Sequence, residues 1–229
     1  MFPIGDERVQ GGPPPFVTYA LIALNVLAFV VELGQGSEAA LQSFIQAWGV
    51  VPREYTAMRD LPPTIPFPFW STLLTSMFLH GGWMHLGGNM LYLWIFGDNL
   101  EKVMGAARFL VFYLVCGLAA SAAHIAFGGG SSVPAVGASG AISGVLGGYI
   151  LMFPGNRIRV LTRGGIMHVP ALVVLGFWIL IQLFNGIGSV ATTSETGGGG
   201  VAYMAHIGGF VAGLVLVKLF ATPSRVTVG

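Results

Sequence analysis

Long apolar segments alternate with shorter polar ones along the chain. Six apolar segments can be separated, each bounded by charged residues or by clusters of glycine and proline. They are Phe16–Leu33, Met84–Phe96 (or on to Leu100), Phe109–Phe127, Ser139–Phe153, Val169–Asn185 and Val201–Phe220. Because about 20 apolar residues in a helix cross a bilayer, this pattern predicts an all-α membrane protein with six transmembrane helices.

The first apolar segment is expected to stay in the protein as a helix. Its apolar run is longer than the roughly 7–15 residues of a signal-peptide core, and the preceding flank mixes acidic residues with Arg8. We therefore expect a membrane domain over residues 16–221, between short tails at residues 1–15 and 222–229.

Two polar segments are predicted to be external connections. Gly34–Leu79 contains five prolines and is too polar to span, so we expect a large loop lying partly in the membrane interface. Its aromatic residues Phe67, Phe69 and Trp70 suit the level of the lipid headgroups. Gly186–Gly200 ends in a run of glycines and is expected to be a flexible loop.

Composition agrees with a protein whose main solvent is the bilayer. Hydrophobic residues make up 54% of the 229 positions and charged residues only 8%, whereas soluble domains usually carry about 25% charged residues. The formal net charge of +1 gives no reason to expect a nucleic-acid partner. The single cysteine, Cys116, cannot form a disulfide within the chain.

The distribution of lysine and arginine predicts which side of the membrane each connection faces. With the N-terminus in the cytoplasm, the cytoplasmic segments hold Arg8, Lys102, Arg108, Arg157, Arg159, Arg163, Lys218 and Arg225. The external segments then hold only Arg53 and Arg59. Because cytoplasmic connections are enriched in basic residues, both termini are predicted to be cytoplasmic.

Four polar side chains are predicted to lie at the same depth, near the external surface. The second apolar segment enters from the outside, so His85 and Asn89, four residues apart, share one face of its first two turns. Ser139 opens the fourth segment and His206 lies early in the sixth, and both segments also enter from the outside. Polar groups at that depth are costly unless they meet each other or a water-filled cavity.

Small residues predict which of these helices touch. Gly209 and Gly213 lie on the same face of the sixth segment as His206. The fourth segment carries closely spaced small residues from Ser139 onward, among them Gly140 and Gly144. Such faces let membrane helices approach closely, so the fourth and sixth segments are expected to pack together and bring the serine toward the histidine.

A serine and a histidine at this depth indicate nucleophilic catalysis. A serine hydroxyl becomes reactive when a neighbouring base accepts its proton, and histidine is the usual base. The oxyanion of such a reaction needs donors aimed at it, and His85, the Asn89 amide and the Ser139 backbone N–H are candidates. Since no carboxylate is expected at this depth to orient His206, the prediction is a Ser–His dyad.

Each of these residues also has a simpler interpretation. Ser139 alone is typical of a packing position, and a membrane histidine such as His206 can bridge helices. A six-helix transporter would line a permeation path with polar residues, but few continue toward the cytoplasm beyond Ser143 and Gln182. The chain has no His-Glu-x-x-His zinc motif and no pair of aspartates within the spanning segments, so other intramembrane protease chemistries do not fit.

Several motifs, in order along the chain, resemble those of the rhomboid family of intramembrane serine proteases. They are His80-Gly-Gly-Trp-Met-His85-Leu-Gly-Gly-Asn89-Met, Trp94-Ile-Phe-Gly-Asp-Asn-Leu-Glu101, Gly137-Ala-Ser139-Gly140 and Ala205-His206-Ile-Gly-Gly209-Phe-Val-Ala-Gly213. The resemblance covers about residues 16–220.

The resemblance implies a compact six-helix rhomboid-like bundle with defined residue roles. Ser139 would be the nucleophile and His206 the general base and then acid, with His85, Asn89 and the Ser139 amide as the oxyanion hole. The substrates would be transmembrane or juxtamembrane segments of single-pass membrane proteins, cut without a metal ion or organic cofactor. The fifth segment and the loop after it would gate entry.

The resemblance also implies a location, a bacterial inner membrane with the active site open to the extracytoplasmic side. An organellar or archaeal membrane is the alternative. It does not predict the natural substrate or the oligomeric state. The closest alternative is an inactive rhomboid-like protein that binds transmembrane clients.

Two features depart from the family pattern. Many relatives carry an aromatic residue four positions after the serine, stacked on the histidine ring, but here that position is Ser143. The orientation of the imidazole therefore depends on some other contact, such as a hydrogen bond. The first loop also lacks the Trp-Arg pair of some members, so its packing cannot be carried over.

Overall fold

The structure is a computed structural model that describes residues 2–9, 11, 14–192 and 202–222. Long helices dominate it, and each apolar segment of the sequence lies largely within one of them. These helices are α1 (Phe16–Leu33), α5 (Trp83–Met104), α6 (Ala106–Gly128), α7 (Ser139–Met152), α8 (Ala171–Thr192) and α9 (Tyr203–Phe220). By length and composition, three of the described helices can cross a membrane, namely α1, α6 and α9.

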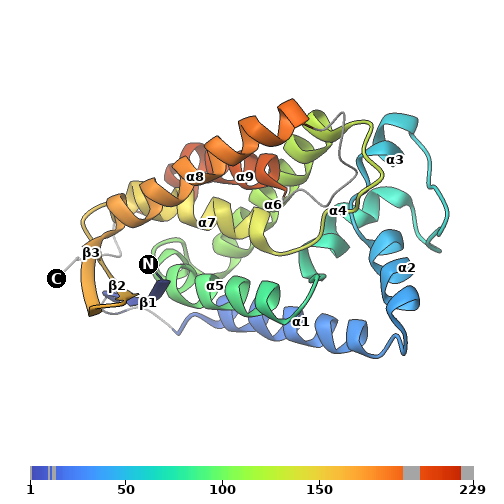
Figure 1. Ribbon diagram of the computed structural model, residues 1–229. Helices are drawn as coiled ribbons and strands as arrows, with labels where there is room; N and C mark the ends of the chain where they lie inside the picture. The colour runs from blue at the N-terminus through green and yellow to red at the C-terminus, as the bar shows by residue number, and fades with distance from the viewer. Residues whose placement is uncertain (1, 10, 12–13, 193–201, 223–229) are drawn as a thin grey trace.

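Helix α7 occupies the centre of the bundle (Figure 1). It packs against α5, α6, α8 and α9, and every residue from Gly140 to Tyr149 is buried. A helix that is apolar on all sides belongs in the interior of a bundle. The position of α7 therefore follows from its sequence, which has no polar face.

Glycines bring α7 and α9 into backbone contact, as the sequence predicted. The carbonyl oxygens of Gly140 and Gly144 lie against Gly209 and Gly213, and a Cβ atom at either α9 glycine would overlap them. Small residues of this kind let membrane helices approach closely. The contact holds the N-terminal end of α7 beside the first turn of α9.

Short helices make up much of the connection between α1 and α5. They are α2 (Glu38–Trp48), α3 (Pro52–Ala57) and α4 (Thr72–Thr75), with 3-10 turns η1 (Phe69–Ser71) and η2 (Ser76–Phe78). Helix α2 begins after Ser37, whose side chain accepts a hydrogen bond from the Ala40 N–H, the usual role of an N-cap serine. The short helices lie at one end of the bundle (Figure 1).

A three-stranded antiparallel sheet is a departure from the predicted all-α fold. Its strands are β1 (Phe2–Asp6), β2 (Arg157–Thr162) and β3 (Gly165–Pro170), in the order β1-β2-β3, at the end of the bundle opposite α2 and α3 (Figure 1). Strands of five or six residues are too short for a clear alternating pattern to stand out between helices. In addition, β1 finds its partner about 150 residues away in sequence, which no local signal reveals.

Helix α8 is displaced relative to the fifth apolar segment. Its predicted start at Val169 is wrong because Val169 and Pro170 complete β3. At the other end the helix continues to Thr192, so the first part of the loop predicted at Gly186–Gly200 is helical. The remainder of that loop, residues 193–200, lies outside the described residues.

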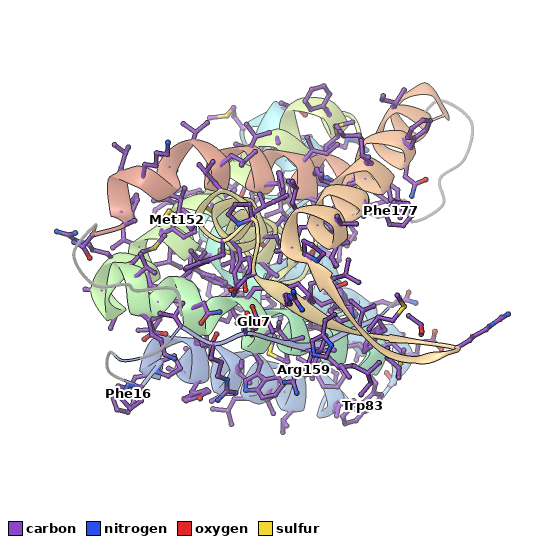
Figure 2. The ribbon with its side chains drawn as sticks, turned by 90° about the vertical axis from the view of Figure 1, so that its left-hand side faces the viewer. Glu7, Phe16, Trp83, Met152, Arg159 and Phe177 are labelled. Atoms are coloured by element: carbon purple, nitrogen blue, oxygen red, sulfur yellow. The ribbon has the colours of Figure 1, made fainter. Side chains whose placement is uncertain are left out.

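A buried polar network joins the sheet to the bundle. The Asp6 carboxylate accepts hydrogen bonds from the Tyr149 hydroxyl and, at 2.8 Å, from the Asn99 side chain. Asn156 in turn donates to the Tyr149 oxygen at 2.7 Å. The hairpin that carries Arg159 extends away from the helices (Figure 2). The hydrogen bonds of this network therefore connect the sheet to α5 and α7.

A carboxylate from α5 caps the start of α1. Glu101 accepts hydrogen bonds from the N–H groups of Val17 (2.9 Å) and Thr18 (2.8 Å) and from the Thr18 hydroxyl (2.8 Å). The first N–H groups of a helix have no partner within it. The glutamate of the second sequence motif therefore serves the packing of α1 on α5.

Candidate active site

Ser139 and His206 are hydrogen-bonded at the end of the bundle away from the sheet. Ser139 is the first residue of α7, and His206 lies in the first turn of α9. The Ser139 Oγ and the His206 Nε2 are 2.8 Å apart, which is close enough for a base to accept a serine proton. The two residues that the sequence predicted as a pair are therefore in contact.

Gly137 shapes the backbone that leads into Ser139. Its φ is +121°, a conformation that side chains other than glycine rarely adopt. Its N–H donates to the Ser76 carbonyl oxygen at 2.8 Å, which fixes this turn to the segment before α5. A Cβ atom at Gly137 would lie only 2.7 Å from the His85 Nε2, so this position needs glycine for space as well.

His85 and Asn89 lie on α5 against Gly137, two residues before the serine. The Gly81 N–H donates to the His85 Nδ1 at 3.3 Å, so the proton of the neutral ring is on Nε2, the nitrogen that faces Gly137. The Asn89 side-chain nitrogen is buried and has no hydrogen-bond partner among the described residues. Two N–H donors thus lie against Gly137, two residues before the serine, and the Asn89 nitrogen is unsatisfied among the described residues.

The second ring nitrogen of His206 contacts a residue that the predicted site did not include. The His206 Nδ1 lies 2.8 Å from the Oε1 of Gln182, which is on α8 and only 8% exposed. The sequence did give one indication of Gln182, because it is a polar residue within an apolar segment. Its pairing could not be read from the sequence, because it depends on how α8 rotates against α9.

An aromatic ring on α8 lies against His206. Trp178, one turn before Gln182 on α8, lies with its ring centroid 5.9 Å from that of His206 and tilted by 38°. Ser143 donates a hydrogen bond from its hydroxyl to the Ser139 carbonyl oxygen at 2.6 Å. The histidine ring is thus covered from α8, and Ser143 bonds to its own helix.

The segment before α5 is fixed by buried polar contacts. The His80 N–H donates to the Glu32 carboxylate of α1 at 3.0 Å, and the His80 ring lies 5.1 Å from that of His85. Burial, with a smaller contribution from His85, lowers the pKa of His80 to about 4, so its ring is neutral at pH 7. Within the described part of the chain, no group of three or more His, Cys, Asp or Glu side chains could hold a metal ion.

A small cavity opens beside the serine. Its polar lining side chains are Ser76, Ser121, His124 and Ser139. The His124 Nε2 is buried and finds no partner in the ranges that the structure describes. A cavity with several polar groups can hold water, and this one lies next to the Ser139 hydroxyl.

Comparison with known proteins identifies the family. Residues 68–223 match the Rhomboid domain. The chain is 33% identical to the protein named rhomboid protease GluP of Bacillus subtilis. The aligned region of 215 residues covers 93% of this chain. The chain belongs to the rhomboid family, and it is accordingly an integral membrane protein with transmembrane helices.

Other relatives come from organelles. Rhomboid protein 1, mitochondrial, of Saccharomyces cerevisiae is 29% identical over 88% of this chain, and rhomboid-like protein 11, chloroplastic, of Arabidopsis thaliana is 29% identical over 68% of it. The chain spans 36% of the length of the Bacillus relative and 52% and 54% of the other two. These relatives are therefore considerably longer proteins.

Proposed function

We propose that the chain is an intramembrane serine endopeptidase in which Ser139 is the nucleophile and His206 the general base. The observation that supports it most directly is the 2.8 Å distance between the Ser139 Oγ and the His206 Nε2. The proposal also agrees with the names of the relatives, one of which is a rhomboid protease.

The reaction would proceed as acyl transfer in two halves. The Ser139 hydroxyl gives its proton to the His206 Nε2 as its oxygen bonds to the scissile carbonyl carbon, which produces a tetrahedral oxyanion. The imidazolium then protonates the leaving amine nitrogen, and the C–N bond breaks to leave an acyl-serine. In the second half, His206 takes a proton from water, the hydroxide adds to the ester carbon, and the serine departs with the proton returned. The cavity beside Ser139 offers room for that water.

The oxyanion would be stabilised by donors from two helices. Candidates are the Asn89 amide, the His85 Nε2–H and the Ser139 backbone N–H, since the first N–H groups of α7 have no intrahelical acceptor. The unsatisfied Asn89 nitrogen supports this role, because a buried donor without a partner is costly to folding. A ligand oxygen at this place would satisfy it.

The proposed topology is six membrane spans with both termini in the cytoplasm of a bacterium. Residues 16–221 would form the membrane domain, flanked by cytoplasmic tails at 1–15 and 222–229, and the active site would open to the extracytoplasmic side. The basic residues of β2 and of the turn after it support this orientation. Substrates would be transmembrane or juxtamembrane segments of single-pass proteins, and the fifth apolar segment with the loop after it would gate their entry.

Cleavage of membrane-embedded peptides tests the proposed activity. The protein is reconstituted in liposomes with a panel of single-pass transmembrane segments that contain small and helix-destabilising residues, and the products are identified by mass spectrometry. We expect wild type and Ser143→Ala, the matched serine one turn further along α7, to release the same fragments, and Ser139→Ala to release none. Fragments that persist in Ser139→Ala would show that another group, or a contaminant, does the cutting.

A further inference from the structure

We propose that Gln182 is a positioning residue that selects the catalytic tautomer of His206 and fixes its ring plane. The inference rests on the proposed function, because it assigns a role in preparing the same base. The contact that carries this role joins the Gln182 Oε1 to the His206 Nδ1, so Gln182 would act through the imidazole.

Gln182 is a buried amide on α8, and its neighbours along the helix are exposed apolar residues. Its neighbours Ile181, Leu183 and Phe184 are 40%, 38% and 81% exposed, whereas Gln182 is 8% exposed. A buried amide in a membrane helix is costly unless it is hydrogen-bonded. The 2.8 Å contact between its Oε1 and the His206 Nδ1 supplies that bond across two helices.

The chemistry of the contact determines where the imidazole proton sits. A neutral imidazole carries one proton, on Nδ1 or on Nε2. Since the Gln182 oxygen can only accept, it favours the tautomer whose Nδ1–H donates to it. The Nε2 lone pair is then left to accept the proton of Ser139, 2.8 Å away. The other tautomer would place an imidazole lone pair against the amide oxygen and a proton between Nε2 and the serine.

The described contacts that orient the His206 imidazole come from α8. Ser143 hydrogen-bonds to the Ser139 carbonyl oxygen. Among the described residues, the titratable groups that act on His206 are the imidazoles His85 and His124, with no carboxylate among them. Trp178 and Gln182, one turn apart on α8, contact the ring and its second nitrogen. A neutral amide thus does the orienting that a carboxylate does in a serine triad, without placing a charge in the membrane.

The size of the effect follows from the change in charge during the reaction. His206 becomes an imidazolium in the transition state, and a hydrogen bond from a charged donor is stronger than one from a neutral donor. Removing the acceptor should therefore lower kcat by about 10- to 100-fold. KM should change little, because Gln182 lies behind the histidine.

The test compares Gln182→Leu and Gln182→Glu with wild type, and uses Asn185→Leu as the control. Asn185 is an exposed amide on the same helix, so its replacement makes the same chemical change away from the histidine. The first readout is the rate at which a fluorophosphonate labels Ser139, which needs no substrate. The second is kcat and KM for a cleaved transmembrane peptide. Gln182→Leu should lose about 10- to 100-fold in both rates at unchanged KM, and Asn185→Leu should match wild type.

Gln182→Glu keeps the acceptor and adds a charge, so it tests the role even if the leucine variant fails to fold. It should retain labelling at pH 8, with the acid limb of its pH profile moved to higher pH by about one unit or more. Labelling of Gln182→Leu at the wild-type rate, or a Gln182→Glu profile identical to wild type, would overturn the positioning role while the protease activity stands. Wild type that labels no more than Ser139→Ala would overturn both.

Discussion

At the scale of single residues, the unpaired side-chain nitrogen of Asn89 is expected to matter for the reaction and not for the stability of the fold. A buried donor with no partner among the described residues does not stabilise the fold. The same donor would gain its partner when an oxyanion forms beside Ser139.

Replacing Asn89 should therefore affect the reaction and spare the fold. We predict that Asn89→Leu lowers kcat by about 10²- to 10³-fold, the typical effect of losing one oxyanion donor. Its Tm should be no lower than that of wild type, since leucine is of similar size and removes the unpaired N–H donor. Asn99→Leu is the matched control, because Asn99 is bonded to Asp6 and to the Val9 N–H and its loss should lower the Tm. A stable Asn89→Leu with wild-type kcat would rule out the donor role.

The sequence predicted the four polar residues of the site from helix direction and depth, and the structure places all four near one another. Ser139 bonds His206, and His85 and Asn89 lie against the turn before the serine. Gln182 was not predicted because hydrogen bonding between helices depends on their relative rotation. A sequence alone specifies the depth of a residue in a helix much better than the neighbour that it faces.

At the scale of elements, the contact between α7 and α9 holds Ser139 and His206 within hydrogen-bonding distance. The glycines of α9 lie directly on carbonyl oxygens of α7. A side chain at either glycine would force the backbones of α7 and α9 apart, because the atoms nearest to it are backbone atoms and not the end of a flexible side chain.

A single methyl group should therefore separate the two helices. We predict that Gly213→Ala lowers the free energy of unfolding by about 1–3 kcal/mol, because the new Cβ overlaps the Gly144 carbonyl oxygen. Gly87→Ala on α5 is the control, since nothing lies within 4 Å of its Cβ position and alanine favours a helix over glycine. Thermal unfolding in detergent measures both. Equal Tm values for the two variants would contradict the close packing of α7 and α9.

At the scale of the whole molecule, the sheet connects the first residues of the chain to the bundle through a carboxyl group. Burial, with a contribution from Asp98, raises the pKa of Asp6 from 3.8 to about 7, and Tyr149, Arg8 and Asn99 oppose the rise. The unfolded chain releases this proton near pH 4 and the folded chain near pH 7. The contribution of Asp6 to stability is therefore greatest at low pH and falls as the pH rises from about 4 to about 7.

An uncharged replacement should remove this pH dependence. Tyr149 and Asn99 both donate to one oxygen of Asp6, so the amide oxygen of Asp6→Asn can accept both bonds. We predict that Asp6→Asn raises the Tm relative to wild type, by more at pH 8 than at pH 5. Glu38→Gln, which neutralises an exposed carboxylate on α2, should leave the Tm difference the same at both pH values. An equal difference at both pH values for Asp6→Asn would contradict the buried acid.

The helical part of the fold was predictable and the sheet was not. Long apolar segments carry their own signal, and the bounds of α1 coincide with those predicted. The strands are short, and β1 depends on a hairpin far along the chain, so the evidence for them lies in tertiary pairing. The half-buried Asp6, which bonds the first strand to the bundle, looks in the sequence like an ordinary charge ahead of the first helix.

The central claim, an activated Ser139 paired with His206, is tested most directly by covalent labelling. The purified protein is treated in detergent with a fluorophosphonate probe, beside Ser139→Ala, His206→Ala and Ser143→Ala. We predict that wild type and Ser143→Ala are labelled and that both dyad variants are not, because only a serine with a base beside it attacks the probe. Folded wild type that labels no more than Ser139→Ala would contradict the account and favour a rhomboid-like protein that binds transmembrane segments without cutting them.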